Sequence, residues 1–390
     1  MTPEILISAG EASSDLYAAR LAQALSRRTG ARFFGMGGPR MAEAGVELVA
    51  HSSEVAVVGI VEALHKIPTV IGVQNRLARE AARRRAALAI LVDSPGTHLG
   101  VARRLKIRGI PVGYFIGPQV WAWRAGRVRV IKRLVQQMVV IFPFEEKIYR
   151  DAGVPVEFVG HPLVDIVRPA MTRTEFAARH GLDAAQLIVA LLPGSRASEI
   201  ERHYPPMLEA CHLIAEEMKA SGRVQFVHVA APGLVAGLRT HDEVSASVEV
   251  KRVEVKRIEG GAYDALAAAD CAVVASGTAT VEAALLGTPL VVIYRVAPLT
   301  AFLLRRMVHT PFFSMVNLIA GRRVAPELMQ EKFTPAAVAR EVCRLLQSQA
   351  ARDEMKAGLA EVRSKLGPGG AIERAADVFA RMLESAAQKS

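Results

Sequence analysis

The sequence has few of the residue patterns that hold metal ions. Its three cysteines, Cys211, Cys271 and Cys343, lie far apart, its ten histidines form no H-x-x-x-H pair, and no D-x-D triplet occurs. Protein metal sites commonly depend on clustered ligands of these kinds. We therefore expect no metal and no cofactor, and we expect the thiols to stay reduced in a cytosolic protein.

Long apolar runs are also missing. The chain starts MTPEILISAG, which places an acid before a very short apolar run and so lacks the form of a secretion signal. No charge-free apolar run approaches the roughly 18 residues that cross a bilayer. We expect a cytosolic protein, either free or lying on a membrane that it does not cross.

Aromatic residues make up only 5% of the chain, whereas 49 basic residues exceed 38 acidic ones and give a formal charge of +11. The basic residues cluster at 79–85, 103–108 and 124–133. Such an excess suits nucleic acid, an acidic lipid surface or a phosphorylated substrate, but it also suits a solvated face. Trp121 and Trp123 adjoin the third cluster, where a packed pair is a simpler interpretation than a base-stacking surface.

Short β-branched runs alternate with longer helical patterns, which predicts parallel βαβ units. The chain has 390 residues, 51% of them apolar, so about two domains are expected. We infer two doubly wound α/β domains, joined near residues 161–185, with a cleft between them and ligands beyond the carboxyl ends of the strands. The expected strands, with the turns that end them, are residues 4–11, 32–38, 87–96, 112–120, 138–145, 156–162, 187–196, 225–231, 248–254, 271–278 and 289–294.

The turn PGSRASE (193–199) follows the first strand of the second half. Gly194 and Ser195 precede Arg196 at the expected helix start, so amides, a hydroxyl and a guanidinium converge as they do around phosphate oxygens. The turn lacks a Walker lysine and the repeated glycines of a dinucleotide site. An ordinary tight turn with Arg196 paired to Glu199 would explain the same residues.

Residues 273–294 (VVASGTATVEAALLGTPLVVIY) indicate strand, turn, helix, turn and strand. Glu282 is the one acid in the helix, and a capping box starting from Thr278 would place its acid at Val281 instead. Because an unpaired buried carboxylate is costly, we expect Glu282 to meet vicinal hydroxyls, as on a ribose, or an arginine such as Arg295. The turn before the helix holds only small or hydroxyl residues: Ser276, Gly277 and Thr278.

Three acids follow strands of the first half. Asp93 ends one strand, where its carboxylate could accept a proton from an incoming hydroxyl. An Asx turn or helix cap before Pro95 is an equally ordinary use of aspartate. Glu11 and Asp15 follow the first strand, and acids at a helix start need no functional explanation.

Residues 55–73 are markedly apolar, and basic residues follow them. A stripe at helical spacing is usually core, but extra valines widen the apolar arc to one that suits a membrane surface. The residues expected at that surface are Val57, Val58, Ile60, Val61, Leu64 and Ile67.

Taken together, these stretches closely resemble lipid-A-disaccharide synthases, bacterial glycosyltransferases of the GT-B fold. The matching segments span most of the chain in family order and include SAGEASSDLYAARL, GMGGPRM, DSPGTHL, LLPGSRASEI, ASGTATVEAALLGTP and NLIAGRRVAPELMQ. The resemblance implies two Rossmann-like domains, with residues 1–165 binding the acceptor and residues 186–367 binding the UDP-sugar. A helix at about 368–390 would pack back on the first domain.

The resemblance also implies the reaction. The enzyme would transfer 2,3-diacylglucosamine from UDP-2,3-diacylglucosamine to 2,3-diacylglucosamine 1-phosphate. The products would be a β-1,6-linked disaccharide 1-phosphate and UDP, formed with inversion and without a metal. The protein would act at the cytoplasmic surface of the inner membrane of a Gram-negative bacterium, and the sequence leaves a homodimer open.

Site residues follow from the family motifs position by position. Asp93 would be the base, and Arg196 would stabilise the diphosphate. The acceptor side would include Glu11, Ser13, Asp15 and His98. The UDP-binding residues would be Gly194, Ser195, Arg196, Gly260, Gly261, Ser276, Gly277, Thr278, Glu282, Asn317 and Gln330.

Several positions depart from the family pattern on the acceptor side. Ser14 replaces a glycine, Thr97 and His98 replace an aromatic–asparagine pair, and Gly117 replaces a serine. These departures concern acyl-chain specificity, and they make His98 a second candidate base. The alternatives are another GT-B enzyme, such as a UDP-N-acetylglucosamine 2-epimerase or the undecaprenyl glucosaminyl transferase, and a basic RNA-binding protein. The small-residue turns argue against the latter, so we expect no nucleic-acid partner.

Overall fold

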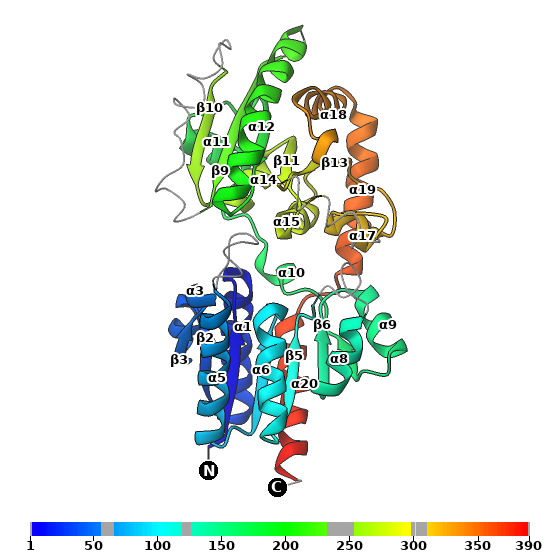
Figure 1. The fold of residues 1–390 in the computed structure, drawn as a ribbon. Coiled ribbons are helices and arrows are strands. Elements are labelled where there is room, and N and C mark those ends of the chain that lie inside the picture. Colours follow the sequence, from blue (N-terminus) through cyan, green and yellow to red (C-terminus); the bar gives the residue numbers. More distant parts are fainter. Residues whose placement is uncertain are drawn as a thin grey trace. The chain divides into compact units, whose positions relative to one another are not determined.

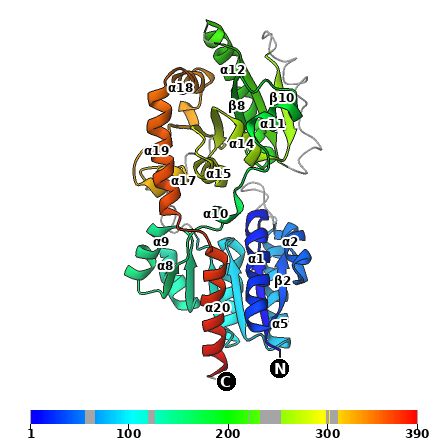
Figure 2. The same ribbon diagram turned by 180° about the vertical axis from the view of Figure 1, so that it is seen from behind.

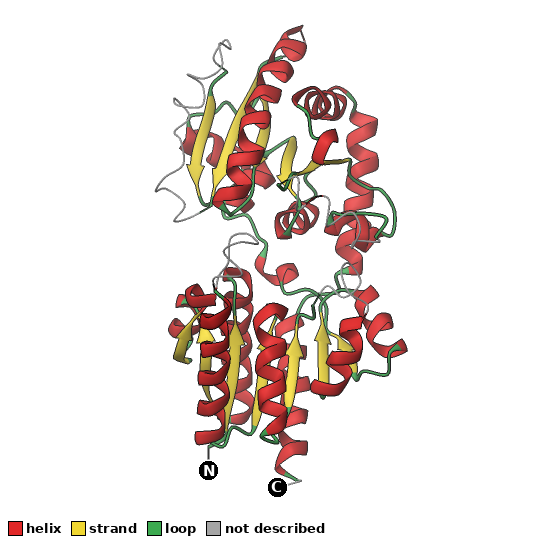
Figure 3. Cartoon of the chain, in the orientation of Figure 1, coloured by secondary structure: helices red, strands yellow, loops and turns green. Residues whose placement is uncertain are grey.

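The computed structural model of the chain describes residues 2–55, 66–118, 126–220, 222–231, 253–297, 301 and 310–388. It divides into two compact units: unit 1 comprises Met1–Pro162 and Leu366–Ser390, and unit 2 comprises Leu163–Lys365. Each unit is a parallel sheet covered by helices (Figures 1 and 2). Figure 3 shows the same alternation of strands and helices along both units. The predicted fold class, two doubly wound α/β domains, is confirmed.

Unit 1 contains a seven-stranded parallel sheet in the order β3-β2-β1-β4-β5-β6-β7. The sheet grows in one direction from β1 and in the other from β4, which pair from Ile5–Leu88 to Ala9–Val92. The carboxyl ends of these two strands form the switch point at which ligands bind in such sheets. The strands are β1 (Glu4–Ala9), β2 (Arg32–Gly37), β3 (Glu47–His51), β4 (Leu88–Val92), β5 (Val112–Phe115), β6 (Gln137–Val140) and β7 (Val156–Phe158).

Helices cover both faces of this sheet. In Figure 1, α5 and α6 lie in front of the strands, and in Figure 2, α1 and α20 lie in front of them. With both faces covered, β1 and β4 form nearly continuous buried apolar runs. The helices are α1 (Ala12–Thr29), α2 (Pro39–Glu43), α3 (Ser52–Val55), α5 (Ile67–Arg83), α6 (Pro95–Ile107), α8 (Gly126–Leu134), α9 (Pro143–Asp151) and α20 (Ala371–Ala387).

The helix α20 belongs to unit 1 although it follows unit 2 in the sequence. Arg28 of α1 forms ion pairs with Glu373 at 2.7 Å and with Asp377 at 2.7 Å. The Arg374 guanidinium donates two hydrogen bonds to the carbonyl of Val159. These contacts fix α20 on the face of the first sheet that α1 also covers.

Unit 2 contains a six-stranded parallel sheet in the order β10-β9-β8-β11-β12-β13. Its switch point lies between β8 and β11, which pair from Cys271–Val189 to Val274–Leu192. The strands are β8 (Leu187–Leu192), β9 (Val224–Ala230), β10 (Val255–Glu259), β11 (Cys271–Ala275), β12 (Leu290–Tyr294) and β13 (Glu327–Met329). The helices are α10 (Leu163–Ile166), α11 (Arg173–His180), α12 (Ala197–Glu217), α14 (Ala262–Ala268), α15 (Thr278–Leu286), α17 (Met315–Ala320), α18 (Pro335–Gln347) and α19 (Gln349–Lys365), with short 3-10 turns at Met218–Ala220 and Gln330–Lys332.

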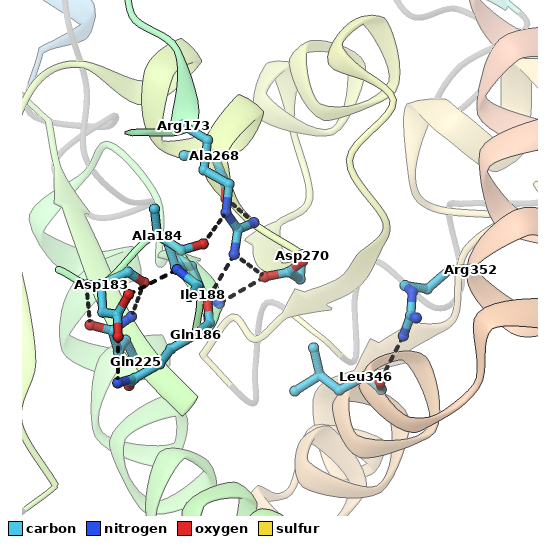
Figure 4. Close-up of polar contacts among 11 residues, drawn as sticks. Arg173, Asp183, Ala184, Gln186, Ile188, Gln225, Ala268, Asp270, Leu346 and Arg352 are labelled. Atoms are coloured by element: carbon cyan, nitrogen blue, oxygen red, sulfur yellow. Dashed lines mark hydrogen bonds and ion pairs between the residues drawn. The ribbon is translucent and has the colours of Figure 1, made fainter. Parts of the chain in front are cut away.

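The domains were expected to join near residues 161–185, with the second domain starting at 186. Within that segment, residues 163–185 are part of unit 2. Arg173 at the start of α11 explains the difference (Figure 4). Its guanidinium pairs with Asp270 at 2.9 Å and donates to the carbonyls of Ala184, Gln186 and Ala268. Because Gln186 and Asp270 directly precede β8 and β11, these bonds fasten α11 to the amino-terminal edge of the second sheet.

Three strands differ from the expectation. The strand expected at 248–254 begins later, at Val255, and residues 248–252 lie outside the described part of the chain. The edge strands β3 and β13 were not expected. Both edge strands are short, with partly exposed residues among the buried ones, so neither shows the continuous apolar run of a central strand.

Within the described ranges, no helix is long and apolar enough to cross a membrane.

Candidate functional site

Asp93 lies directly after β4, at the switch point of unit 1. Asp93 and Ser94 both have positive φ, 53° and 48°, a conformation that costs non-glycine residues about 1–3 kcal/mol each. The Asp93 carbonyl accepts hydrogen bonds from His98 Nδ1 at 2.7 Å and from the Tyr114 hydroxyl at 2.6 Å. A strained turn is thus held by two donors from α6 and β5. Non-glycine residues with positive φ cluster at functional sites.

The Asp93 side chain is half-buried. Burial, together with the nearby charge of Glu11, raises the pKa of the Asp93 carboxyl to about 6. Desolvation disfavours the charged form, and a like charge adds to that effect. At neutral pH the carboxyl is therefore largely ionised but more basic than an exposed aspartate, as a general base requires.

The other residues predicted for the acceptor side have different environments within unit 1. Asp15 is buried, and its carboxylate accepts hydrogen bonds from the amides of Gly38, Arg40 and Met41. Asp15 therefore caps α2 and fixes the GMGGPRM turn. Glu11 is exposed, and Ser13 is half-buried in the first turn of α1.

His98 is fully buried, with none of its surface exposed. Its Nδ1 contacts the Asp93 carbonyl and its Nε2 contacts Ser8 Oγ at 2.9 Å. Burial lowers the pKa of His98 to about 4. Both ring nitrogens are thus engaged inside unit 1, and the hypothesis that His98 is a second base is wrong.

The turn after β8 holds a carboxylate of its own. Glu199 Oε2 accepts hydrogen bonds from the amides of Ser195 and Arg196 at 3.2 and 3.4 Å. Glu199 Oε1 lies 3.4 Å from Arg196 Nη1. Gly194, with φ 125°, allows the approach, because a Cβ there would lie 2.5 Å from Glu199 Oε2. The Arg196–Glu199 pair considered from the sequence is present, so the turn has the contact expected of an ordinary tight turn at a helix start.

His203, which the sequence analysis missed, joins this turn to the end of β12. It is fully buried on α12, with Nδ1 2.7 Å from the carbonyl of Pro193. Its Nε2 accepts from the Arg295 amide at 2.9 Å, so the proton lies on Nδ1. The available signal was periodicity: His203 falls three residues after Ile200 and four before Met207, on the buried face of α12.

The loop from β11 to α15 leaves the start of its helix without a side-chain cap. Gly277 is the N-cap residue and Thr278 is the first helical residue, so Thr278 does not cap the helix. Thr280 Oγ1 donates to the Gly277 carbonyl, and Ser276 Oγ donates to the Phe313 carbonyl. Gly277 and Thr278 are exposed. The first amides of α15 thus face a position suited to an anion.

Glu282 is half-buried in the next turn of α15. Burial alone raises the pKa of its carboxyl to about 7. The alternative of an ion pair with Arg295 is wrong: that guanidinium lies 4.9 Å from the centre of the Phe333 ring and donates to the Gln330 and Phe333 carbonyls. No other residue in the described part of the chain pairs with Glu282, so the carboxyl keeps its binding capacity for a ligand.

The remaining donor-side residues fall into two groups. Gly260 and Gly261 follow β10 with φ of 70° and 65°, and Gln330 follows β13 with φ 53°. A positive φ on a glutamine at a strand end is again a mark of a constrained site. Asn317 is buried, and its amide makes four hydrogen bonds within unit 2, to Val324, Ala325 and Glu327. Asn317 therefore holds the loop that leads into β13.

Comparison with known proteins identifies the family. The family model described as Lipid-A-disaccharide synthetase matches residues 5–376. The chain is 46% identical to the lipid-A-disaccharide synthase of Solibacter usitatus over 385 residues and 46% identical to that of Myxococcus xanthus over 382, covering 98% of each chain in both pairs. The chain belongs to the lipid-A-disaccharide synthase family. It is therefore a hexosyltransferase of lipid A biosynthesis.

Solved structures agree on the fold of this family member. A putative UDP-N-acetylglucosamine 2-epimerase from Listeria monocytogenes has a TM-score of 0.67 at 12% identity, covering 99% of this chain and 98% of its own. The S. aureus MnaA–UDP co-structure has a TM-score of 0.66 at 11% identity, covering 98% of this chain and 97% of its own. The calicheamicin glycosyltransferase CalG4 has a TM-score of 0.57 at 17% identity, covering 98% of both chains. The predicted GT-B architecture is confirmed, and at these identities the likeness extends to the fold alone.

Two departures from the family pattern have local explanations. Ser14 is buried, and its Oγ accepts from the Glu11 amide and donates to the Glu11 carbonyl, which closes the start of α1. A Cβ at Gly117 would lie 2.8 Å from both Met138 Cε and the Tyr149 hydroxyl. A serine at position 117 would therefore require these two side chains to move.

The membrane residues expected from the sequence are mostly outside the described residues. This applies to Val57, Val58, Ile60, Val61 and Leu64. Ile67 begins α5 with 47% of its surface exposed, and Ile71, one turn later, has 43% exposed. Two large apolar side chains thus face solvent at the end of α5 that adjoins the apolar segment.

Among the described residues, no group of three or more histidine, cysteine, aspartate or glutamate side chains is arranged to hold a metal ion.

Proposed function

We propose that the enzyme transfers 2,3-diacylglucosamine from UDP-2,3-diacylglucosamine to 2,3-diacylglucosamine 1-phosphate. The products are the β-1,6-linked disaccharide 1-phosphate and UDP, with inversion at the anomeric carbon and no metal ion. The family supports the reaction type. The observation that carries the proposal is the Asp93 carboxyl, held at the switch point of unit 1 by a strained turn and made more basic by burial.

Asp93 is the base of the proposed reaction. A sugar hydroxyl is a poor nucleophile at neutral pH, so its proton must leave as its oxygen attacks. The 6-hydroxyl oxygen of the acceptor bonds to C1 of the donor sugar, and its proton passes to an Asp93 carboxylate oxygen. The bond from C1 to the diphosphate oxygen breaks, and its electron pair leaves with UDP. Attack from the face opposite UDP inverts C1.

The donor diphosphate binds at the turn after β8 in this proposal. The amides of Ser195 and Arg196 and the Arg196 guanidinium already hold the Glu199 carboxylate. A diphosphate takes over these donors, and Arg196 then offsets the charge that develops on UDP as it leaves. Gly194, Ser276, Gly277 and Thr278 line the same carboxyl edge of the sheet, where the first amides of α15 are available to a second phosphate.

Glu282 binds the ribose hydroxyls in this proposal, since two carboxylate oxygens match two vicinal hydroxyls. Gly260 and Gly261 offer backbone groups to the uracil, and Gln330 completes the edge from β13. UDP in the MnaA co-structure, a protein of the same fold, supports a nucleotide of this kind. Asn317 contributes indirectly through its loop.

The membrane part of the proposal places the enzyme on the cytoplasmic surface of the inner membrane. Residues 57–67 and the exposed Ile67 and Ile71 form the apolar contact. Arg79, farther along α5 and exposed, would meet acidic headgroups. Both substrates are lipids, so an enzyme bound at that surface meets them directly.

The test of the proposed reaction is product analysis with the purified enzyme. Incubation with both diacyl precursors should yield disaccharide 1-phosphate and UDP in equal amounts, with a β anomeric configuration by NMR and unchanged rate in EDTA. UDP-N-acetylglucosamine alone should remain unchanged, which separates the enzyme from an epimerase. Epimerised sugar, or no disaccharide from the two precursors, would contradict the proposal.

A further inference from the structure

We propose that His98 is a positioning residue that aims the Asp93 carboxylate by holding the Asp93 carbonyl. The inference rests on the proposed role of Asp93 as the base. His98 itself does not touch substrate in this account. It acts through one hydrogen bond to the backbone of the base.

The first step is the conformation of the turn. Asp93 and Ser94 are consecutive residues in the left-handed region, with φ of 53° and 48°. Neither residue is a glycine, so the chain alone would favour another conformation. The surroundings must therefore enforce this one, and the side chain of Asp93 points where the turn directs it.

The second step is the set of contacts that enforce the turn. The Asp93 carbonyl accepts from His98 Nδ1 at 2.7 Å and from the Tyr114 hydroxyl at 2.6 Å, so both of its lone pairs are used. The Asp93 amide donates to the Phe115 carbonyl at 3.0 Å. A Cβ on Gly10 would lie 2.4 Å from Ser94 Oγ, so the end of β1 leaves space for the turn only because residue 10 is a glycine.

The third step is the state of the His98 ring. A carbonyl can only accept, so Nδ1 carries the proton. Nε2 then accepts from the Ser8 hydroxyl at 2.9 Å, and the ring is neutral. Ser8 and His98 are both fully buried, with 0% of their surface exposed. The donor to Asp93 is thus fixed in tautomer and orientation from the interior of β1.

The experiment compares two replacements of His98. In His98→Asn the amide nitrogen can take the position of Nδ1 and donate to the Asp93 carbonyl. His98→Leu has a similar volume and no donor. We expect His98→Leu to lower kcat about 10- to 100-fold, with KM for both substrates and the UDP dissociation constant within about twofold, because misplacing a reacting group by about 1 Å costs up to about 10²-fold. His98→Asn should restore kcat to within about threefold of the wild-type value.

Hydrogen exchange of the amides of residues 93–98 gives a readout that needs no activity. It should accelerate in His98→Leu and stay near the wild-type rate in His98→Asn. Unchanged kcat and exchange in a folded His98→Leu protein, or equal losses in both variants, would overturn the positioning role. Asp93→Asn is measured in parallel. Wild-type turnover in that variant would show that Asp93 is not the base of the proposed function. The hydrogen-exchange result would still decide whether His98 holds the turn.

Discussion

At the scale of single residues, burial makes the ionised carboxylates of Asp93 and Glu282 less stable than those of exposed acids. Burial raises the pKa of Asp93 to about 6 and that of Glu282 to about 7. A half-buried carboxyl of this kind weakens the fold when it is ionised, so its presence near the carboxyl edge of a parallel sheet favours a functional role. Glu282 stood out in the sequence because it is the one charged residue of its helix, but the raised pKa depends on packing that no motif encodes.

The pH dependence of transfer should report Asp93. Only the ionised carboxyl can accept a proton, and its raised pKa means that this form is lost as pH falls through about 6. We expect kcat/KM to fall about tenfold per pH unit below pH 5.5 and to level off above pH 7. A profile with its acidic limb near pH 4 would show that the base is an unperturbed carboxyl.

Replacing Glu282 with glutamine should stabilise the enzyme and weaken UDP binding at the same time. For an acid with a raised pKa, folding is penalised once pH rises from the ordinary value of 4.5 through about 7. Glu282→Gln removes that penalty, so its Tm should exceed the wild-type value by a few degrees at pH 8, with the gap closing toward pH 4.5.

UDP titration completes this test. Loss of a charged hydrogen-bond acceptor should raise the UDP dissociation constant about tenfold or more at pH 8. Unchanged UDP affinity would exclude Glu282 from the ribose site. A Tm gap independent of pH would show that the carboxyl does not carry the predicted penalty.

At the scale of elements, the carboxyl edge of the second sheet is a set of turns held together by buried side chains. His203 links the Pro193 carbonyl after β8 to the Arg295 amide after β12. Asn317 fixes the loop before β13 through the backbone of Val324 and Ala325. These bonds hold the backbone of the turns in place without a ligand, and fixed backbone dipoles of this kind can contribute to catalysis.

In the proposed function, Glu199 is the side chain that the diphosphate displaces. Its carboxylate occupies the Ser195 and Arg196 donors that we assign to the diphosphate. Glu199→Gln keeps an acceptor but removes the competing charge, so UDP should bind about fivefold more tightly, in line with about 1 kcal/mol for a screened charge pair. Glu201→Gln, an exposed change on the same helix, is the control. Weaker UDP binding in Glu199→Gln would mean that Glu199 supports the ligand instead of competing with it.

At the scale of the whole molecule, the sequence predicted two parallel α/β sheets because their central strands are unbroken apolar runs followed by small-residue turns. The edge strands β3 and β13 escaped prediction since they are short and partly exposed. Residues 163–185 looked like a linker, and only long-range contacts attach them to unit 2: those of Arg173 with residues around β8 and β11, and those of Asp264 and Gln225 with the backbone of the segment. His98 and Asp15 were assigned to the acceptor site, yet their bonds are internal, and such long-range pairing leaves no local pattern.

Membrane association is a property of the whole enzyme, and variants of the exposed residues of α5 test it. The double variant Ile67→Ser/Ile71→Ser should reduce flotation with vesicles containing acidic lipids at least threefold, because two exposed isoleucines lose their burial in lipid. Ile107→Ser on α6, where 84% of the side chain is exposed, is the matched control and should bind vesicles normally. Equal binding by all three proteins would contradict an α5 contact, provided that their melting temperatures agree.

The most direct measurement is turnover of both diacyl precursors by Asp93→Asn beside the wild-type enzyme, with UDP affinity measured on the same preparations. The account predicts a loss of kcat of at least about 100-fold, the range by which positioned bases accelerate reactions. The UDP dissociation constant should stay within twofold, because Asp93 and the UDP-binding residues belong to different units. Turnover near the wild-type rate in a folded Asp93→Asn enzyme would contradict the central claim that Asp93 takes the proton.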